Sequence, residues 1–387
     1  MAIRAIKPTD FTWFDYSRYS FSLGVSFRGS LYLSGHTASE FDAKVEHIVV
    51  NGDISQQVRT AYRKIEAILA AARYTFSDVV RVVEYLNPYG IKHYDEVSSV
   101  RQEVLGACNP TVNTVPVRSL LRNDAFIEIE ITASTGGRKE REIDEKEDIG
   151  TSGLIFLPTI TSTDHSGDIV GLGDIVAQTE AIMVRAQKML ADLGLSLNDI
   201  VKTVDYITPS ALGAYRNTKN VRRAYLGPVY PAAAGIVMPR LFHRDALVQY
   251  DFIASRSAKK VINPGWLRYD KLTYNPGILT EDLLFLSGQG AINLDTEEVE
   301  CKEDVVAQAE FIYNNILSVV EAAGGNSGNI IKTVEYVVPN ALQNYKGVGR
   351  VRSKVFCEPY PASTGIVCES LLRPEMLLEV DSLAAFD

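Results

Sequence analysis

Two acidic side chains near the end of the sequence LLEVDSL (377–383) are the first candidates for chemistry. Strand-type alternation places Glu379 and Asp381 on one face, and Leu378, Val380 and Ser382 on the other. On an exposed sheet face such a carboxylate is simply solvated. In a partly apolar site, burial raises the pKa of a carboxyl group, which can then donate a proton near neutral pH. Glu379 is therefore a candidate general acid.

The cysteines and histidines suggest less chemistry. Cys368 is more readily a small buried apolar residue than a nucleophile, because the sequence places no histidine to activate it. A pocket-lining role is preferred for it. His36 is either a polar pocket group or a loop residue, and the loop is favoured. The four cysteines show no CxxC spacing and the five histidines no HxxxH or HExxH pattern, so we expect no metal site.

One phrase occurs three times, as RVVEYLNPYGIKHY (81–94), KTVDYITPSALGAY (202–215) and KTVEYVVPNALQNY (332–345). Register holds well beyond it, because each of four sets of landmark residues is also separated by 121 and then 130 positions. The chain therefore consists of three copies, at 1–135, 136–256 and 257–387. The landmarks are the acids Asp53, Asp174 and Asp304; the prolines Pro88, Pro209 and Pro339; the arginines Arg101, Arg222 and Arg352; and the prolines Pro110, Pro231 and Pro361.

Each copy predicts the same order of elements. An apolar strand comes first, at 30–36, 153–159 and 283–289. A long amphipathic helix follows, with Asp53, Asp174 or Asp304 as its N-cap. The repeated phrase then supplies a strand, a proline stop and the start of a second helix. Two more strands close the copy, at 111–117 and 126–133 in the first. The order β, α, β, α, β, β predicts an α+β fold, with two helices on one face of a sheet.

The other face of each sheet must also be buried. Three equivalent sheets can bury these faces against one another around an axis, as in a C3 oligomer. We therefore expect an intramolecular pseudo-trimer with sheets inside and helices outside. The charged segment 136–150 is expected to be a linker or edge strand.

These elements resemble the RidA/YjgF family of reactive-intermediate deaminases, once per copy. The resemblance rests on LSGHT (33–37), LSGQG (286–290), the long helix, the strand ending in proline, and a final strand containing E-x-[ED]. It implies a chorismate-mutase-like fold, clefts between neighbouring subunits, and hydrolytic deamination of 2-aminoacrylate-like enamines and imines without a cofactor.

The family's motif is kept unevenly. Its substrate-binding arginine falls on Val112, Ala233 and Ser363, so no copy keeps it. Its acid falls on Glu128, Gln249 and Glu379. Its pocket tyrosine falls on Tyr274 in copy 3 and Phe21 in copy 1, while copy 2 offers Asp144. Copy 2 also has Leu157, Pro158 and Thr159 in place of SGQ, which makes it a scaffold or the second wall of a neighbour's cleft.

The resemblance thus implies one main site around Glu379, with Glu128 as a second catalytic candidate. Backbone N–H groups near Ser287–Gln289 and at Gly365 are expected to hold a developing oxyanion. The expected substrate-binding residues are Tyr274, Ser287, Gly288, Gln289, Ser363, Thr364, Gly365 and Cys368, together with Ser34, Gly35 and His36.

A second resemblance is to chorismatases, which hydrolyse the enolpyruvyl ether of chorismate, and it rests on PASTGIVCESLLRPEMLLE (361–379). Three functions stay open. The first is a hydrolase of an enamine, imine or enol ether of a small organic acid. The second is a chorismatase-like hydrolase, lyase or tautomerase of secondary metabolism. The third is a small-ligand-binding protein without turnover.

The repeated phrase also contains an acid within its strand, at Glu84, Asp205 and Glu335. Either these acids point toward the threefold axis, or each pairs with a basic residue under the helices. Pairing with the repeated arginine, Arg101, Arg222 or Arg352, is favoured because both members recur in every copy.

Composition limits the partners. The chain has 387 residues and a formal net charge of −9, which disfavours nucleic acid or an anionic membrane as a main partner. No apolar run reaches membrane-spanning length, and the N-terminus lacks the apolar core of a signal peptide, so a cytoplasmic location is expected. We expect a small-molecule substrate and a monomeric chain, with a further homodimer left open.

Overall fold

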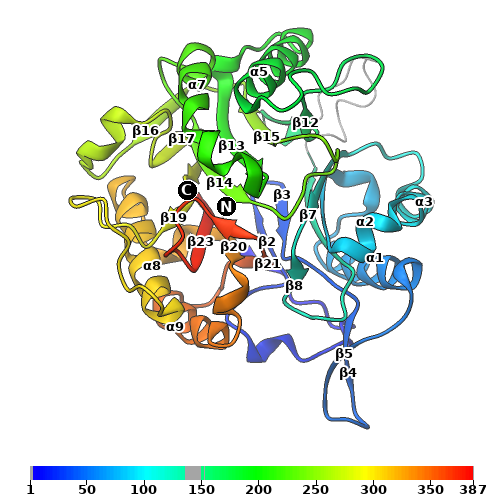
Figure 1. The fold of residues 1–387 in the computed structure, drawn as a ribbon. Helices are drawn as coiled ribbons and strands as arrows, with labels where there is room; N and C mark the ends of the chain where they lie inside the picture. Colours follow the sequence, from blue (N-terminus) through cyan, green and yellow to red (C-terminus); the bar gives the residue numbers. More distant parts are fainter. Residues whose placement is uncertain (1–2, 136–149, 152, 387) are drawn as a thin grey trace.

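The computed structural model describes residues 3–135, 150–151 and 153–386, and they form a mixed α+β fold (Figure 1). The expected position Asp144 and most of the charged segment lie outside the described residues. The first sheet has the strand order β1-β2-β3-β9-β6-β7. Its strands are β1 (Arg4–Ala5), β2 (Gly24–Phe27), β3 (Ser30–Leu33), β6 (Val79–Leu86), β7 (Thr111–Pro116) and β9 (Ile127–Ser134), and a separate hairpin pairs β4 (Ser39–Asp42) with β5 (His47–Val50).

The second and third sheets repeat this plan. The second has the order β10-β11-β15-β13-β14-β22 and the third β16-β17-β18-β23-β20-β21-β8. The second is built from β10 (Gly150–Thr151), β11 (Leu154–Phe156), β12 (Ile160–Thr161), β13 (Ile200–Ile207), β14 (Ala232–Val237), β15 (Val248–Ser255) and β22 (Ser370–Leu371). The third is built from β16 (Lys259–Ile262), β17 (Gly277–Thr280), β18 (Leu283–Leu286), β19 (Gln289–Gly290), β20 (Ile330–Val337), β21 (Ala362–Val367), β23 (Leu378–Ala385) and β8 (Ser119–Leu120).

The repeated phrase forms the same strand in each sheet. β6, β13 and β20 each lie between a parallel and an antiparallel neighbour, as the expected order requires. Two features were not expected. The first strand of copies 1 and 3 belongs to a hairpin, β2–β3 or β17–β18. Short strands also cross between copies, because β8 of copy 1 joins the third sheet and β22 of copy 3 joins the second.

The helices cover the outer faces of the sheets, while strands lie toward the middle of the molecule (Figure 1). The long helices are α1 (Ile54–Ala71), α5 (Ile175–Asp192) and α8 (Val305–Ala322). The second helical layer contains α2 (Pro88–Lys92), α3 (Tyr94–Leu105), α6 (Leu212–Tyr215), α7 (Lys219–Leu226) and α9 (Val348–Val355). The predicted N-caps are confirmed, because Asp53, Asp174 and Asp304 each accept a backbone N–H of the first turn.

A cavity of about 90 Å³ lies where the three sheets meet. Tyr85, Tyr206 and Tyr336, one from each copy, line it. Three buried ion pairs between copies surround it, and each joins a basic residue of one central strand to an acid of a neighbouring sheet. They are Lys332–Glu130 at 2.9 Å, Lys202–Asp381 at 2.6 Å and Arg81–Asp251 at 3.5 Å. This charged layer joins all three sheets.

The repeated acid and arginine pair under the helices in every copy. Arg101 lies 2.6 Å from Glu84, and Arg352 lies 2.7 Å from Glu335. Arg222 lies 3.6 Å from Asp205, which also accepts a hydrogen bond from a tyrosine hydroxyl at 2.8 Å. The favoured pairing is therefore confirmed, and the alternative of acids on the axis is wrong. Alternation explains this, because the neighbouring tyrosines of the same strands face the cavity.

Within the described residues, no helix combines the length and apolar character needed to cross a membrane. The same residues contain no group of three or more His, Cys, Asp or Glu side chains arranged to hold a metal ion.

Candidate active site

Glu379 lies near the start of β23, where it is 5% exposed. Two glycines allow this placement. The carboxyl group lies directly over Gly288, where an added Cβ would overlap it. The backbone N–H of Gly235, on β14 of copy 2, donates a hydrogen bond to the carboxyl. Glu379 is therefore held between copies 3 and 2.

The surroundings of Glu379 favour its neutral form. Burial is the largest cause that raises the pKa of Glu379, to about 8, and Asp381 raises this pKa further. Lys202 and the Gly235 N–H act in the opposite direction, but Lys202 is already paired with Asp381 at 2.6 Å. Near neutral pH the side chain is a carboxylic acid, which can donate a proton.

Glu128 repeats this arrangement between copies 1 and 3. Its carboxyl lies over Gly35, where an added Cβ would overlap it, and accepts a hydrogen bond from the backbone N–H of Gly365 on β21. Burial again raises the pKa, to about 8, with Glu130 adding to the rise and Lys332 opposing it. The chain therefore holds two carboxyl groups of the same kind, which we call the Glu379 site and the Glu128 site. Neither carboxyl lines the central cavity.

The third equivalent position is closed. Gln249 is fully buried, and its amide bonds the Thr114 carbonyl of copy 1 at 3.2 Å and the Phe242 N–H at 3.3 Å. Nearby, Asn113 donates to the Leu157 carbonyl at 3.3 Å and to the Thr159 hydroxyl at 3.2 Å. The residues of copy 2 that replace SGQ thus form an internal hydrogen-bond network that includes the Asp251 carboxyl, and an amide stands where the other two copies have Glu379 and Glu128.

In the structure, several of the expected site residues border a different glutamate from the one expected from the sequence. Ser363, Thr364 and Gly365 lie on β21, which borders Glu128 and not Glu379. Thr364 bonds Glu130 at 2.6 Å, and the Ser363 hydroxyl accepts a hydrogen bond from Thr333. Their grouping with Glu379 is wrong, because the neighbour that completes a site depends on the direction in which the copies follow one another around the axis.

The wall beside Glu379 comes from copy 2, which is one of the two roles expected for that copy, although its residues were not assigned to Glu379. It consists of Ala233, Ala234 and Gly235 on β14. The alignment of the three copies identified these positions, and the equivalence of Gly235 with Gly365 was the available signal. The alignment did not show which glutamate each of these two strands borders.

Two of the expected substrate-binding serines, Ser287 and Ser34, hold neighbouring copies together. The Ser287 hydroxyl accepts the Ala233 N–H at 2.8 Å and donates to the Asn275 carbonyl at 2.6 Å. The Ser34 hydroxyl does the same with the Ser363 N–H at 2.8 Å and the Ser22 carbonyl at 2.6 Å. Since each hydroxyl has one proton to donate, neither serine has a donor left for a ligand.

The expected oxyanion donors are also occupied. The Gly288 N–H donates to the Ala233 carbonyl at 3.0 Å, and the Ser287 N–H to the Pro276 carbonyl at 2.9 Å. The Gly365 N–H donates to Glu128. The N–H groups of Ser287 and Gly288 are therefore not free for an oxyanion, and the expected role of Gly365 in binding one stays a prediction. The N–H groups of Gly235 and Gly365 support the two glutamates instead.

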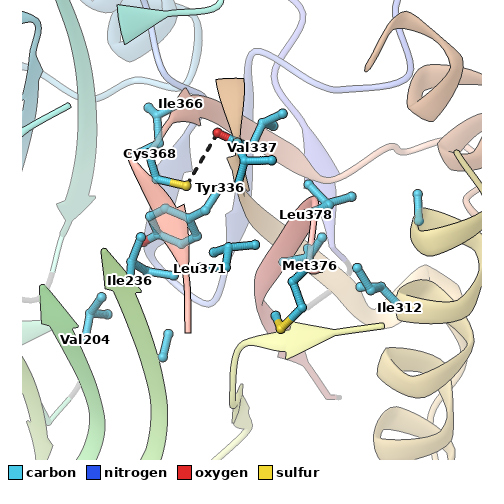
Figure 2. Close-up of a cluster of buried hydrophobic side chains, with 14 of the residues drawn as sticks. Val204, Ile236, Ile312, Tyr336, Val337, Ile366, Cys368, Leu371, Met376 and Leu378 are labelled. Carbon is cyan, nitrogen blue, oxygen red and sulfur yellow. Dashed lines mark hydrogen bonds between the residues drawn. The ribbon is translucent and has the colours of Figure 1, made fainter. Parts of the chain in front are cut away.

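Cys368 does not line either site. It is fully buried in an apolar cluster with Tyr336, Ile366 and Leu371, and its thiol donates to the Val337 carbonyl at 3.4 Å (Figure 2). Burial raises the pKa of the Cys368 thiol well above its ordinary value. This packing on the core side of β21 argues against the expected pocket-lining role, although Glu379 is close enough to raise the pKa of the thiol further.

His36 and Gln289 occupy equivalent positions after the two SG motifs. His36 is 3% exposed, and burial lowers its pKa to about 3, with nearby Lys64 lowering it further. It is therefore a neutral, buried loop residue, and its Nε2 atom has no hydrogen-bond partner among the described residues. The Gln289 amide donates to the Ser287 carbonyl at 3.1 Å and to the Tyr269 hydroxyl at 3.4 Å.

Tyr274 is half-buried next to the Glu379 site, and its ring meets that of Tyr269 edge-on at 5.6 Å. Burial raises the pKa of Tyr274, and among the charged groups around it Arg268 lowers this pKa while Glu379 raises it. The adjoining residues fix the segment to copy 2, because Arg222 donates to the Thr273 hydroxyl at 3.1 Å and the Asn275 N–H donates to the Pro231 carbonyl at 2.9 Å.

The sequence model of the family described as Endoribonuclease L-PSP matches residues 16–135 and 270–386, more than half of the chain. The chain therefore belongs to this family, the RidA/YjgF family. A RutC family protein from Pyrococcus horikoshii is 34% identical over 134 residues, which cover 35% of this chain and 96% of that protein.

Solved structures add a likeness of fold. A chorismatase crystal structure covers 80% of this chain and 93% of its own, with a TM-score of 0.54 at 16% identity. A YjgF-family protein from Mycobacterium tuberculosis is 26% identical and covers 35% of this chain and 100% of its own, with a TM-score of 0.28. The chorismatase match extends beyond a single copy, so it concerns the arrangement of most of the chain.

Proposed function

We propose that this protein is a hydrolase that protonates an enamine, imine or enol ether of a small organic acid, with Glu379 and Glu128 as general acids. One observation carries the proposal. Two buried carboxyl groups, each over a glycine and each bonded by a glycine N–H of a neighbouring copy, have pKa values of about 8. A general acid is most effective when its pKa lies near the working pH. Membership of the RidA/YjgF family supports the same chemistry.

The proposed reaction begins with transfer of the Glu379 proton to the terminal carbon of a C=C–N or C=C–O unit. The neighbouring carbon becomes an iminium or oxocarbenium centre, and the carboxyl becomes a carboxylate. Water adds to that centre and gives one proton back to Glu379. The tetrahedral adduct then releases ammonia or an alcohol and leaves a carbonyl product. Buried Glu379 needs no second residue to supply the first proton.

A chorismatase-like reaction on a larger enol ether is the second candidate. The likeness to a chorismatase over 80% of this chain supports a comparable arrangement of copies, at an identity that speaks for fold alone. The family's arginine is replaced by Ala233 in the wall beside Glu379, which leaves more room than an arginine would. A substrate bulkier than 2-aminoacrylate fits this change.

We also infer that the chain is an intramolecular pseudo-trimer of copies 1–135, 136–256 and 257–387, with sheets inside and helices outside. The three ion pairs between copies and the tyrosines around the shared cavity support it. Each potential site then lies between two copies, and the pairing of copy 2 with copy 1 around Gln249 serves as scaffold. We therefore expect a single chain to turn over a small molecule, without nucleic acid or a membrane as a partner.

Turnover by single variants tests this function. The full chain is assayed with 2-aminoacrylate generated in situ and with chorismate, and release of ammonia or pyruvate is measured. Replacing the acid that serves the substrate, through E379Q or E128Q, is expected to lower turnover by about 10²-fold or more. E103Q, on the surface of α3, is the matched control and is expected to keep full turnover. Full turnover by the E128Q/E379Q double variant contradicts the proposal, and binding of either compound without turnover favours a ligand-binding protein.

A further inference from the structure

Arg268 is a cation without an assigned role beside the Glu379 site. It lies on a short 3₁₀ helix (Leu267–Lys271) whose first residue, Leu267, is 79% exposed. Arg268 itself is half-buried, and its Nε–H is buried with no hydrogen-bond partner among the described residues. No ion pair between described residues includes it. Burying an arginine N–H without a partner costs free energy, so the position calls for an acceptor that the folded chain does not supply.

The arginine faces the same pair of tyrosines as Glu379. Tyr269 stacks on Trp266 at 5.8 Å and meets Tyr274 edge-on at 5.6 Å. The charges of Arg268 and Glu379 both act on each of these two tyrosines. Gln289, which follows Gly288 beneath the Glu379 carboxyl, donates to the Tyr269 hydroxyl. Both tyrosines are therefore within electrostatic range of a proton donor and of a cation.

The other cations near Tyr274 are already engaged. Arg222 donates to Thr273 and Thr218 and pairs with Asp205. Arg373 donates to the Glu297 carbonyl at 2.7 Å. The Tyr274 hydroxyl has no hydrogen-bond partner among the described residues. Arg268 and Tyr274 together thus offer unused donors on one side of the Glu379 site.

The Glu128 site lacks both donors. Residues 13 and 16 correspond to Trp266 and Tyr269, so Asp15 stands at the position of Arg268, and Phe21 stands at that of Tyr274. Phe21 is placed as Tyr274 is, because Ser20 bonds Arg352 and the Ser22 N–H donates to the Pro361 carbonyl. The Asp15 carboxylate accepts hydrogen bonds within its own turn, from the Ser17 backbone N–H and the Arg18 side chain. The proton donors of the two sites match, but the arginine and the tyrosine hydroxyl of one site are replaced in the other, where Arg122 is a cation that acts on Glu128.

We propose that Arg268 and the Tyr274 hydroxyl bind the carboxylate of an anionic substrate whose other end meets Glu379. A guanidinium can bond both oxygens of a carboxylate, and the tyrosine can add a third bond. The arginine comes from the segment before β17, so it replaces the missing family arginine from a different element. This inference rests on the proposed function only for the reacting role of Glu379.

Binding of a small carboxylate tests the proposal without any turnover. Pyruvate and its uncharged isostere pyruvamide are titrated into the full chain by ligand-observed NMR. R268M and Y274F are expected to weaken pyruvate binding, R268M by about tenfold or more, while pyruvamide binding changes little. R268K, which keeps the charge but loses the two-pronged geometry, is expected to fall in between. D15N/F21Y, the matched change at the other site, is expected to leave pyruvate binding to the Glu379 site unaltered.

Three outcomes overturn the inference. Pyruvate affinity is unchanged in R268M, or pyruvate and pyruvamide weaken equally, or D15N/F21Y lowers pyruvate affinity as much as R268M does. Because the probe is not turned over, these results are independent of E379Q kinetics. Loss of turnover in E379Q together with intact pyruvate binding in R268M refutes the anion site and leaves the proposed function standing. Full turnover by the E128Q/E379Q double variant together with weakened pyruvate binding in R268M refutes the proposed function alone.

Discussion

Glu379 and Glu128 keep their protons at neutral pH because burial penalises the charged form more than the nearby groups support it. Each has a lysine in range, but that lysine is committed to a second acid two residues further along the same strand. Glu379 and Glu128 are thus each left with one backbone N–H to stabilise a negative charge. The expectation of a single main site around Glu379 stays a prediction. The two carboxyl groups have the same raised pKa, and the two sites differ in the charged residues near them.

The pH dependence of turnover follows from these values. A general acid acts in its protonated form, so kcat/KM is expected to be level below about pH 7 and to fall through about pH 8, tenfold per pH unit above it. A steady-state pH profile measures this. A rise of kcat/KM through pH 8 is the opposite result and assigns the glutamate the role of a base.

The same carboxyls make folding depend on pH. Because their folded pKa values are raised from 4.5 to about 8, the stability that their neutral form contributes is complete below about pH 4.5. This contribution is lost as the pH rises through about 8. In the E128Q/E379Q variant, we expect this part of the pH-dependent decrease in the free energy of unfolding to be absent.

At the scale of elements, the repeated alignment predicted the strands, helices and N-caps because each depends on residues close in the sequence. Asp53, for example, needs only the N–H groups of the next turn. The site walls were not predictable in the same way. Whether β14 or β21 borders Glu379 depends on contacts between copies, and nothing local to either strand records them. The burial of Cys368 likewise depends on which face of the sheet the side chain occupies at the end of β21.

The serine hydroxyls that join neighbouring copies give a stability prediction. S287A and S34A each remove the acceptor of a neighbouring backbone N–H, and each is expected to lower the free energy of unfolding by about 1–3 kcal/mol. Urea unfolding measures the change. S318A is the matched control, because the Ser318 hydroxyl bonds within exposed α8 and its loss is expected to cost less than about 0.5 kcal/mol. Equal small effects in all three variants contradict the role of the serines between copies.

At the scale of the whole molecule, the pseudo-trimer that we infer would place in one chain what a C3 trimer repeats three times. Joining the copies allowed each site to change separately. The result is one site next to Arg268, one with Asp15 at the corresponding position, and one in which Gln249 closes the position. The central ion pairs remain in all three places, which indicates that they serve assembly of the sheets and not chemistry at one site.

The central ion pairs can be tested through Lys332. Its ammonium group bonds Glu130 at 2.9 Å, Thr364 at 3.0 Å and the Leu33 carbonyl of the first sheet. K332M leaves Glu130 buried without its cation, and we expect a loss of about 3–5 kcal/mol in the free energy of unfolding. K354M breaks the exposed pair with Glu310 and is expected to cost at most about 1 kcal/mol. Denaturant unfolding distinguishes these values, and losses of similar size would argue against a structural role for the central layer.

The protonation state of Glu379 is the central claim, and carboxyl ¹³C NMR of the glutamate-labelled chain measures it directly. Two carboxyl resonances are predicted to titrate with midpoints of about 8, one absent from E379Q and the other from E128Q. Below that pH both should have the chemical shift of a protonated acid. Titration of the Glu379 resonance near the ordinary value of 4.5 would contradict the account, because the side chain would then be a carboxylate with no proton to donate at neutral pH.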